Sequence, residues 1–154
     1  MEKAEHMKIL FVVFVSLILF VPIRAGECLR MTLKKSLENA DAVFAGKVLK
    51  ITEVEPDESD RRQETWIFGT LYKVRVRVEQ YWKGASTKET DFLIYFGGTE
   101  TNWTFEFKEG ERFLVFAKKG RDTDDLYVDP CAGTDKIENA KKDLEELGKG
   151  KRIK

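Results

Sequence analysis

A regular alternation of apolar and polar side chains over residues 71–82, LYKVRVRVEQYW, constrains this chain more than any other feature. In an extended chain the apolar side carries Tyr72, Val74, Val76, Val78 and Trp82, interrupted only by Gln80. The opposite side carries Lys73, Arg75, Arg77 and Glu79. A period of two is typical of a β-strand with one buried face, and Lys83-Gly84 supplies a turn after it. We therefore predict a long half-buried strand. Polyanion binding along its charged side is the alternative, although two arginines and one lysine make a small electrostatic footprint.

Other apolar segments predict further strands at residues 42–54, 91–96, 112–118 and 126–128. Gly46 lies inside the first of these, where a glycine indicates a bulge or a bend. Residues 103–107 alternate in the same way and predict a hairpin with the strand at 112–118. Because no helices alternate with these segments, the pattern predicts a small closed or nearly closed antiparallel barrel of five strands.

Two helices are expected to flank the barrel. Thr32 can cap a short helix whose apolar positions are Leu33, Leu37 and Ala40. Near the end, Asp135 and Glu138 form a capping-box pattern at the start of an amphipathic helix that Gly148 would end. Its apolar face would consist of Ile137, Ala140, Leu144 and Leu147. The basic tail at residues 149–154 is predicted to be frayed and solvated, with binding to a surface as the alternative.

The first residues have the layout of a secretory signal. Residues 9–21 are apolar except for Ser16, basic residues precede them, and the small pair Ala25-Gly26 follows. Such a run is too short to span a bilayer comfortably, so we predict a signal peptide at residues 1–25 that is cleaved after Ala25. An uncleaved anchor and initiation at Met7 are the alternatives. The prediction places a single domain at residues 26–148 in a secreted, periplasmic or extracellular location.

Cys28 and Cys131 are the only cysteines. Export to an oxidising compartment favours a disulfide between them. Closing a loop of about a hundred residues would stabilise the fold by roughly 4–5 kcal/mol in the chain-entropy model. A reactive thiol is the weaker alternative, because the only histidine, His6, lies in the predicted signal peptide.

Composition argues against several classes of function. The 27 basic and 27 acidic residues balance, which gives no general attraction to nucleic acid. Without a histidine in the mature chain, no Ser-His-Asp or Cys-His pair can form, so we expect no enzyme activity, no cofactor and no metal site of its own. Four acidic residues bunch near the last strand at Asp122, Asp124, Asp125 and Asp129. They predict a solvated turn, with calcium binding as the alternative, although their spacing is not that of an EF-hand.

Several blocks in order resemble the netrin-like module, the family that includes the inhibitory domain of the tissue inhibitors of metalloproteinases and its bacterial relatives. The blocks are Cys28, SLENADAVFAGKV at 36–48, YWKG at 81–84, FKEGERFLVFA at 107–117, and Cys131 followed by an amphipathic helix. The resemblance covers nearly all of the mature chain. It implies a five-stranded OB-fold barrel with flanking helices.

The resemblance also implies a mechanism. In the metalloproteinase inhibitors the mature N-terminal amine and the first carbonyl chelate the zinc ion of the protease and displace its catalytic water. Gly26 would take the chelating position here, within a partner-binding ridge formed by Gly26, Glu27, Cys28, Leu29 and Arg30. The chain departs from the family pattern at two positions: Gly26 replaces the first cysteine, and Glu27 replaces a small side chain.

The leading hypothesis from the sequence is therefore a secreted, monomeric, non-enzymatic module that binds a protein partner, in its most concrete form an extracellular zinc metalloprotease. It would bind no nucleic acid and keep no membrane anchor after cleavage. A cell-surface or carbohydrate-binding domain that uses exposed Trp66, Tyr81 or Trp103 is the second hypothesis, and a scaffold without a ligand site is the third. Asn102-Trp103-Thr104 is a glycosylation sequon, which has meaning only in a eukaryotic secretory pathway.

Overall fold

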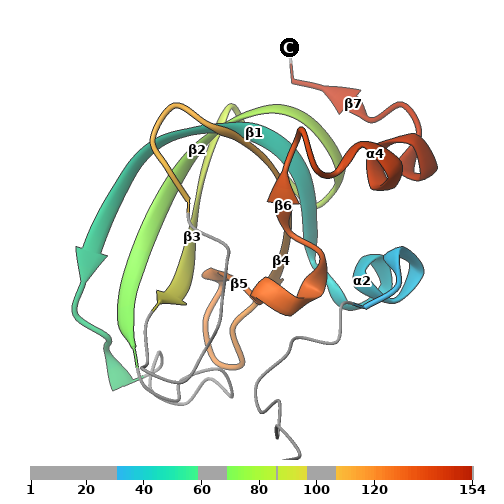
Figure 1. Cartoon of the computed structure of the whole chain (residues 1–154). Helices are drawn as coiled ribbons and strands as arrows, with labels where there is room; N and C mark the ends of the chain where they lie inside the picture. Colours follow the sequence, from blue (N-terminus) through green and yellow to red (C-terminus); the bar gives the residue numbers. More distant parts are fainter. Residues whose placement is uncertain (1–30, 59–68, 86, 97–106, 154) are drawn as a thin grey trace, which may run out of the picture.

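The alternation at residues 71–82 forms strand β2 (Thr70–Lys83). Val74 and Val76 are completely buried on its inner side, whereas Lys73 and Arg75 are exposed on its outer side. The computed structural model describes residues 31–58, 69–85, 87–96 and 107–153. Its other elements are α2 (Leu33–Asn39), β1 (Ala42–Val54), β3 (Glu89–Phe96), β4 (Arg112–Lys119), β5 (Leu126–Val128), the 3₁₀-helix η1 (Pro130–Ala132), β6 (Asp135–Lys136), α4 (Lys141–Leu147) and β7 (Lys151–Arg152) (Figure 1).

The strands close into a five-stranded barrel in the order β1-β2-β3-β5-β4, and β4 pairs again with β1. The OB-like barrel with flanking helices is therefore confirmed. One pair departs from the predicted antiparallel arrangement: β3 and β5 run parallel where Leu93 lies opposite Tyr127. A closed ring with an odd number of strands cannot reverse direction at every contact, so at least one parallel pair is required.

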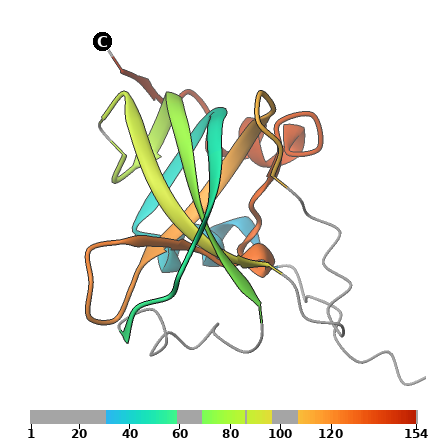
Figure 2. The same ribbon diagram turned by 90° about the vertical axis from the view of Figure 1, so that its left-hand side faces the viewer.

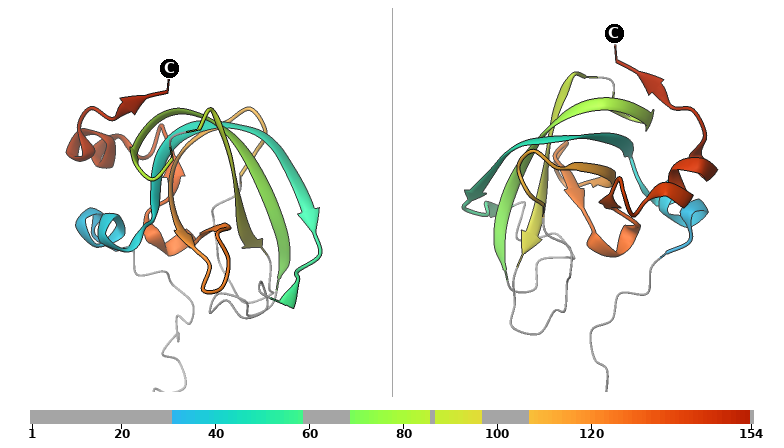
Figure 3. Two further views of the ribbon diagram at one scale, coloured as in Figure 1. Left: turned by 180° about the vertical axis from the view of Figure 1, so that it is seen from behind. Right: turned by 45° about the horizontal axis from the view of Figure 1, so that its top comes forward.

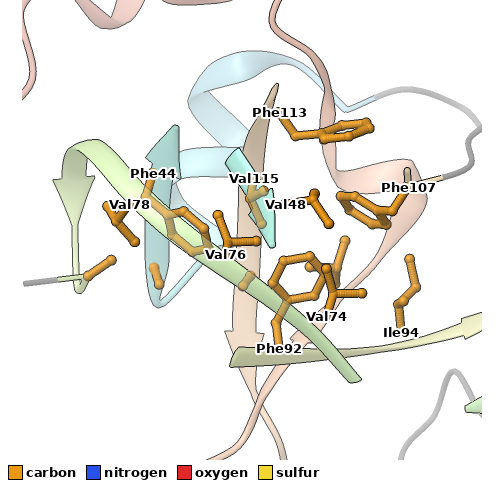
Figure 4. Close-up of a cluster of buried hydrophobic side chains, with 14 residues drawn as sticks. Phe44, Val48, Val74, Val76, Val78, Phe92, Ile94, Phe107, Phe113 and Val115 are labelled. Carbon is orange, nitrogen blue, oxygen red and sulfur yellow. The ribbon is translucent and has the colours of Figure 1, made fainter. Parts of the chain in front are cut away.

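Phenylalanines fill the barrel interior together with valines from β1, β2 and β4 (Figure 4). The ring centroids of Phe107 and Phe113 are 4.6 Å apart, and those of Phe92 and Phe107 are 5.0 Å apart. Such contacts add about 0.5–1.5 kcal/mol each beyond the burial of area. Phe107 comes from the segment before β4 and is 4% exposed, so this segment contributes to the core although it is not part of a barrel strand.

Gly46 marks an irregularity in β1, as predicted. The register between β1 and β2 shifts between Ala45 and Gly46. A Cβ atom at Gly46 would lie 2.4 Å from the carbonyl oxygen of Arg77 and 2.6 Å from a methyl carbon of Val76. Because no side chain fits this gap, the glycine allows β1 to press against β2 at the bend of the barrel.

Both helices cover one side of the barrel, where they lie one above the other (Figures 1 and 3). Leu33 and Leu37 of α2, and Leu144 and Leu147 of α4, pack on a second apolar cluster formed by Ala40, Val43, Leu114, Phe116 and Ala140. Helix α2 begins after Thr32, as predicted, although the Thr32 side chain makes no capping hydrogen bond. Neither α2 nor α4 lies on the opposite side of the barrel, where Figure 2 looks onto strands β1, β2 and β3.

The predicted start of the C-terminal helix is wrong. Helix α4 begins at Lys141, and Asp135–Lys136 instead forms β6, which pairs with Phe113 and Leu114 of β4. The Asp135 carboxylate accepts hydrogen bonds from the backbone of Lys136 at 2.7 Å and from Asn139 Nδ2 at 3.0 Å. The side chain that resembled a helix cap therefore organises a turn, because pairing with the edge of β4 outweighs the local helical pattern.

The prediction of a frayed basic tail is also wrong for its described part. Lys151–Arg152 forms β7, which pairs with Gln80 and Tyr81 of β2. Just before it, the indole Nε1 of Trp82 donates a hydrogen bond to the carbonyl of Gly148 at 2.9 Å. Trp82 thus fixes the end of α4, and from there the chain can reach the part of β2 that β3 does not cover.

Candidate functional site

The predicted partner-binding residues 26–30 lie outside the described residues, as does the predicted signal peptide at 1–25. The structure does show where the chain enters the fold. The backbone N–H of Met31 donates to the carbonyl oxygen of Cys131 at 3.5 Å, and Asn39 Nδ2 contacts the Met31 sulfur at 3.6 Å. The start of the described chain is therefore held against the turn that contains Cys131.

The turn that contains Cys131 consists of η1, Gly133 and Thr134. Asp129 accepts a hydrogen bond from the backbone N–H of Cys131 at 2.8 Å and so caps η1. Gly133 ends η1 with a φ of 94°, a left-handed conformation that favours glycine. Thr134 is buried, and its hydroxyl oxygen accepts a hydrogen bond from Phe116 N at 2.8 Å. The turn is thereby tied to β4 and gives Cys131 a fixed position.

Helix α2 packs on the barrel directly after Met31, where the described chain begins. Ser36 is 2% exposed, and Leu33 and Leu37 pack on the second apolar cluster. The ammonium of Lys83 donates to the carbonyl of Leu37 at 3.0 Å and also to that of Ala40. A cation at this position satisfies the free carbonyls at the helix C-terminus and interacts favourably with the helix dipole.

Cys28 lies three residues before Met31. Three residues of extended chain span at most about 11 Å, so Cys28 is within reach of the turn at Cys131. A disulfide needs the two Cα atoms to lie within roughly 4.4–6.8 Å of each other. The contact between Met31 and Cys131 is compatible with the predicted disulfide, which stays a prediction because Cys28 is outside the described residues.

The aromatic residues proposed for carbohydrate binding divide into two groups. Trp66 and Trp103 lie outside the described residues, together with the sequon at 102–104. Tyr81 is partly buried and packs against the barrel core, where it also pairs with β7. Trp82 likewise serves the packing of α4. The described aromatic residues near the end of β2 are therefore used by the fold.

Three of the bunched acidic residues, Asp124, Asp125 and Asp129, have a local role. Asp124 forms an ion pair with Lys119 at 2.6 Å, and this hydrogen bond lowers the pKa of Asp124 and raises that of Lys119. The Asp125 carboxylate accepts a hydrogen bond from the Thr123 hydroxyl at 2.8 Å, and Asp129 caps η1. Within the described ranges, no three His, Cys, Asp or Glu side chains gather as a metal site would require.

Two adjoining hollows lie between α4 and the barrel, with volumes of about 410 and 420 Å³. Two ion pairs line them: Arg112 Nε donates to Glu79 at 2.8 Å, and Lys136 Nζ lies 2.8 Å from Glu111. Both hollows are also bordered by Ile137 and Leu144. The two ion pairs account for most of the charge at these hollows, whose other charged lining residues are Arg152, Glu138 and Lys141.

The structure brings together a charged surface that sequence reasoning underestimated. We call it the basic face, and it consists of Lys47, Lys50, Lys73, Arg75, Arg77 and Arg112, all of which are exposed. Only the three residues of β2 were recognised from the alternation. Strand pairing places Lys47 and Lys50 of β1 and Arg112 of β4 beside these three residues. No pattern within a single strand could have revealed this arrangement.

One ion pair in the basic face is well defined. Arg75 Nε and Nη2 donate to the two carboxylate oxygens of Asp91 at 2.8 and 2.9 Å. These hydrogen bonds hold the pKa of Asp91 below its ordinary value of 3.8, against an opposing effect of partial burial, and the charge of Lys73 also contributes to the lowering. Asp91 therefore stays ionised at neutral pH and neutralises Arg75.

Among the described residues, no helix is long and apolar enough to cross a membrane. In comparisons with known proteins, no family model matches this chain and no curated protein sequence matches it.

Proposed function

We propose that this protein is a secreted, non-enzymatic OB-fold module of the netrin-like type that binds a protein partner through residues 26–30. The observation that supports this is the hydrogen bond between Met31 and Cys131, because it anchors the chain directly after the proposed binding residues. A short segment held at its base by a rigid turn loses less conformational entropy on binding than a free tail does.

Inhibition of an extracellular zinc metalloprotease is the most concrete form of this function. After cleavage behind Ala25, the α-amino group and carbonyl of Gly26 would approach the zinc ion of the protease, and the Cys28–Cys131 disulfide would fix their direction. Since Gly26 replaces a cysteine, ordering it costs entropy that a second disulfide would remove. The Glu27 carboxylate selects for a protease whose pocket offers a cation, because an unpaired buried carboxylate is costly.

The test compares two forms of the secreted protein after mass spectrometry has fixed the N-terminus. One form begins at Gly26, and the other carries one additional N-terminal alanine, which moves the amine away from the chelating position. The Gly26 form should inhibit at least one protease in a panel of extracellular zinc metalloproteases, and the extended form should not. A protein with one additional alanine at its C-terminus is the matched control and should retain inhibition.

Two results would contradict parts of this proposal. If neither form inhibits any protease of the panel, the metalloprotease form is wrong. If both forms inhibit equally, the protein does not act through its N-terminal amine.

Attachment to a cell surface is the second candidate function, and the exposed basic face is the observation that favours it.

A further inference from the structure

The C-terminal tail lies against a part of β2 that β3 does not reach. The register of β2 and β3 ends where Arg77 lies opposite Glu89. Beyond that point β2 pairs with β1 on one side, and at Gln80 and Tyr81 it pairs with β7 on the other. We call this second side of β2, at residues 79–82, the tail edge. The backbone groups along a strand edge are a template for a further strand, and here the tail of the same chain takes that place.

A small number of contacts holds the tail at this edge. Two residue pairs join β7 to β2 in the described structure, and β7 lies between α4 and the C-terminus (Figure 1). The side chains of Lys151 and Arg152 are exposed, whereas Ile153 is partly buried and packs against the barrel core. Segments with few apolar contacts and exposed hydrogen bonds open at the lowest cost in free energy. The tail can therefore leave the edge while the barrel stays folded.

Gly150 shows what the tail edge requires of a strand that lies against it. A Cβ atom at Gly150 would lie 2.8 Å from the carbonyl oxygen of Tyr81 and 2.8 Å from Cγ of Gln80. The Gln80 side chain can turn away, but the carbonyl belongs to the backbone of β2. Glycine permits such a close approach of two backbones. A segment that binds here therefore needs a glycine directly before its two paired residues.

A hollow of about 410 Å³ borders the tail edge. Besides the ion pair described above, its lining includes Ala45, Ile137 and Leu144, and Arg152 of the tail stands beside them. Strand addition obtains affinity from main-chain hydrogen bonds and specificity from pockets for alternate side chains. An apolar side chain in the place of Arg152 would contact the apolar lining of the hollow. Such a ligand would make contacts that the exposed Arg152 does not require, and so would compete with the tail.

We propose that the tail edge is a peptide-binding site of the strand-addition type and that the C-terminal tail is its resident ligand. The partner is an extended protein segment in which a glycine takes the place of Gly150, an apolar residue that of Arg152 and an aliphatic residue that of Ile153. This segment displaces β7 and pairs with Gln80 and Tyr81 in the same register. Residues 26–30 take no part in it, so the interaction is independent of protease inhibition.

The test uses the full secreted protein with Gly150→Val, in which the clash with β2 prevents the tail from docking. A synthetic peptide of residues 148–154 that carries Arg152→Phe is titrated into the ¹⁵N-labelled protein and followed by NMR. The variant should bind this peptide at least about tenfold more tightly than the unmodified protein does, because there the tethered tail competes at a high effective concentration. The amide signals of Gln80, Tyr81 and Trp82 should shift.

Two controls separate docking of a strand from general stickiness. Lys149→Val introduces the same side chain one residue earlier, where the side chain is exposed, and should bind the peptide like the unmodified protein. A peptide that carries Gly150→Val as well should bind the variant at least about tenfold more weakly than the first peptide, because overpacking against the β2 backbone opposes it.

A chain that ends at Gly148 guards against misfolding of the Gly150→Val variant. It keeps the carbonyl that accepts the hydrogen bond from Trp82. It should retain the circular dichroism spectrum of the full protein and bind the peptide as tightly as the Gly150→Val variant does. If this shortened chain unfolds, β7 is a fixed strand of the barrel and the proposal is wrong.

Three further outcomes would overturn the proposal. The first is that neither the Gly150→Val variant nor the shortened chain binds the peptide. The second is equal affinity in the Gly150→Val variant, the Lys149→Val variant and the unmodified protein, or signal shifts that lie away from the tail edge. The third is a dimer of the unmodified protein in which two copies exchange tails, because the occupant would then be a second copy of this chain.

Discussion

The inner and outer sides of strands β1 and β2 share one backbone but have opposite properties. On the inside, Val48, Val74 and Val76 are at most 1% exposed and pack against phenylalanines (Figure 4). On the outside, Lys47 and Arg77 are exposed and repel each other. Because successive side chains of a strand point to opposite faces, core packing and surface charge are carried by alternate residues. Changes on the two sides should therefore have separable effects.

Phe113→Ala tests the inner side most severely. The side chain is completely buried between Phe107 and the barrel wall, so its removal leaves a cavity in the closed core. We expect the free energy of unfolding to fall by about 3–5 kcal/mol, measured by urea denaturation. Lys118→Ala on the same strand is exposed and should change it by less than about 0.5 kcal/mol. Equal effects of the two variants would contradict the division between inside and outside.

Gly46→Ala tests a place where strands β1 and β2 approach closely. The added methyl group would meet the Arg77 carbonyl oxygen at 2.4 Å, so the backbones of β1 and β2 must separate. We expect a loss of about 1–3 kcal/mol in unfolding free energy, because overpacking forces the backbone to shift. Thermal unfolding followed by circular dichroism provides the measurement. Lys47→Ala at the next position should leave the midpoint nearly unchanged, and a neutral Gly46→Ala would show that the strands are not in close contact there.

Asp91→Asn tests the bidentate ion pair between Arg75 and Asp91 on the outer side. A depressed pKa in the folded state stabilises the fold above the unfolded pKa, near 3.8, and this contribution is lost as the pH falls through the lower folded pKa. The variant should therefore be less stable at pH 7, by no more than about 1 kcal/mol because both partners are partly exposed. The difference should vanish at a pH below the folded pKa of Asp91.

The matched control for this ion pair is Glu89→Gln. Glu89 lies two residues earlier on the same strand and forms no ion pair within 4.0 Å among the described residues. Denaturation curves recorded from about pH 2 to 8, a range that brackets the ordinary aspartate pKa of 3.8, should show a smaller and flatter difference for this variant. Identical pH profiles for both variants would mean that the pair of Arg75 and Asp91 does not contribute.

Lys47→Gln should change the free energy of unfolding less than the other variants, and it should raise this free energy where the others lower it. Removing this charge relieves repulsion from Arg77 and Arg112, so stability should rise by a few tenths of a kcal/mol at low salt. Screening should abolish the gain at about 1 M salt, where the Debye length is about 3 Å. Lys34→Gln on α2 should show no such gain. Destabilisation by Lys47→Gln at low salt would show that the positive surface carries no energetic penalty.

The position of Cys131 separates what local sequence could predict from what it could not. Neighbouring residues correctly predicted that a helix begins after Thr32 and that Pro130-Cys131 follows a short strand. The contact between Met31 and Cys131 joins residues a hundred positions apart and depends on closure of the whole barrel. Residues 26–30 and their role remain a prediction from resemblance.

Local sequence by itself determined the five barrel strands, the irregularity at Gly46, the start of α2 and the end of α4, since side-chain period and glycine act within a few positions. Only the tertiary structure decided the parallel contact of β3 and β5, the pairing of β6 and β7, and the rows that align Lys47 with Arg77 and Arg112. The physical reason is that register between distant strands is set when the ring closes. Ring closure minimises the free energy of the whole barrel, and no single segment contains that information.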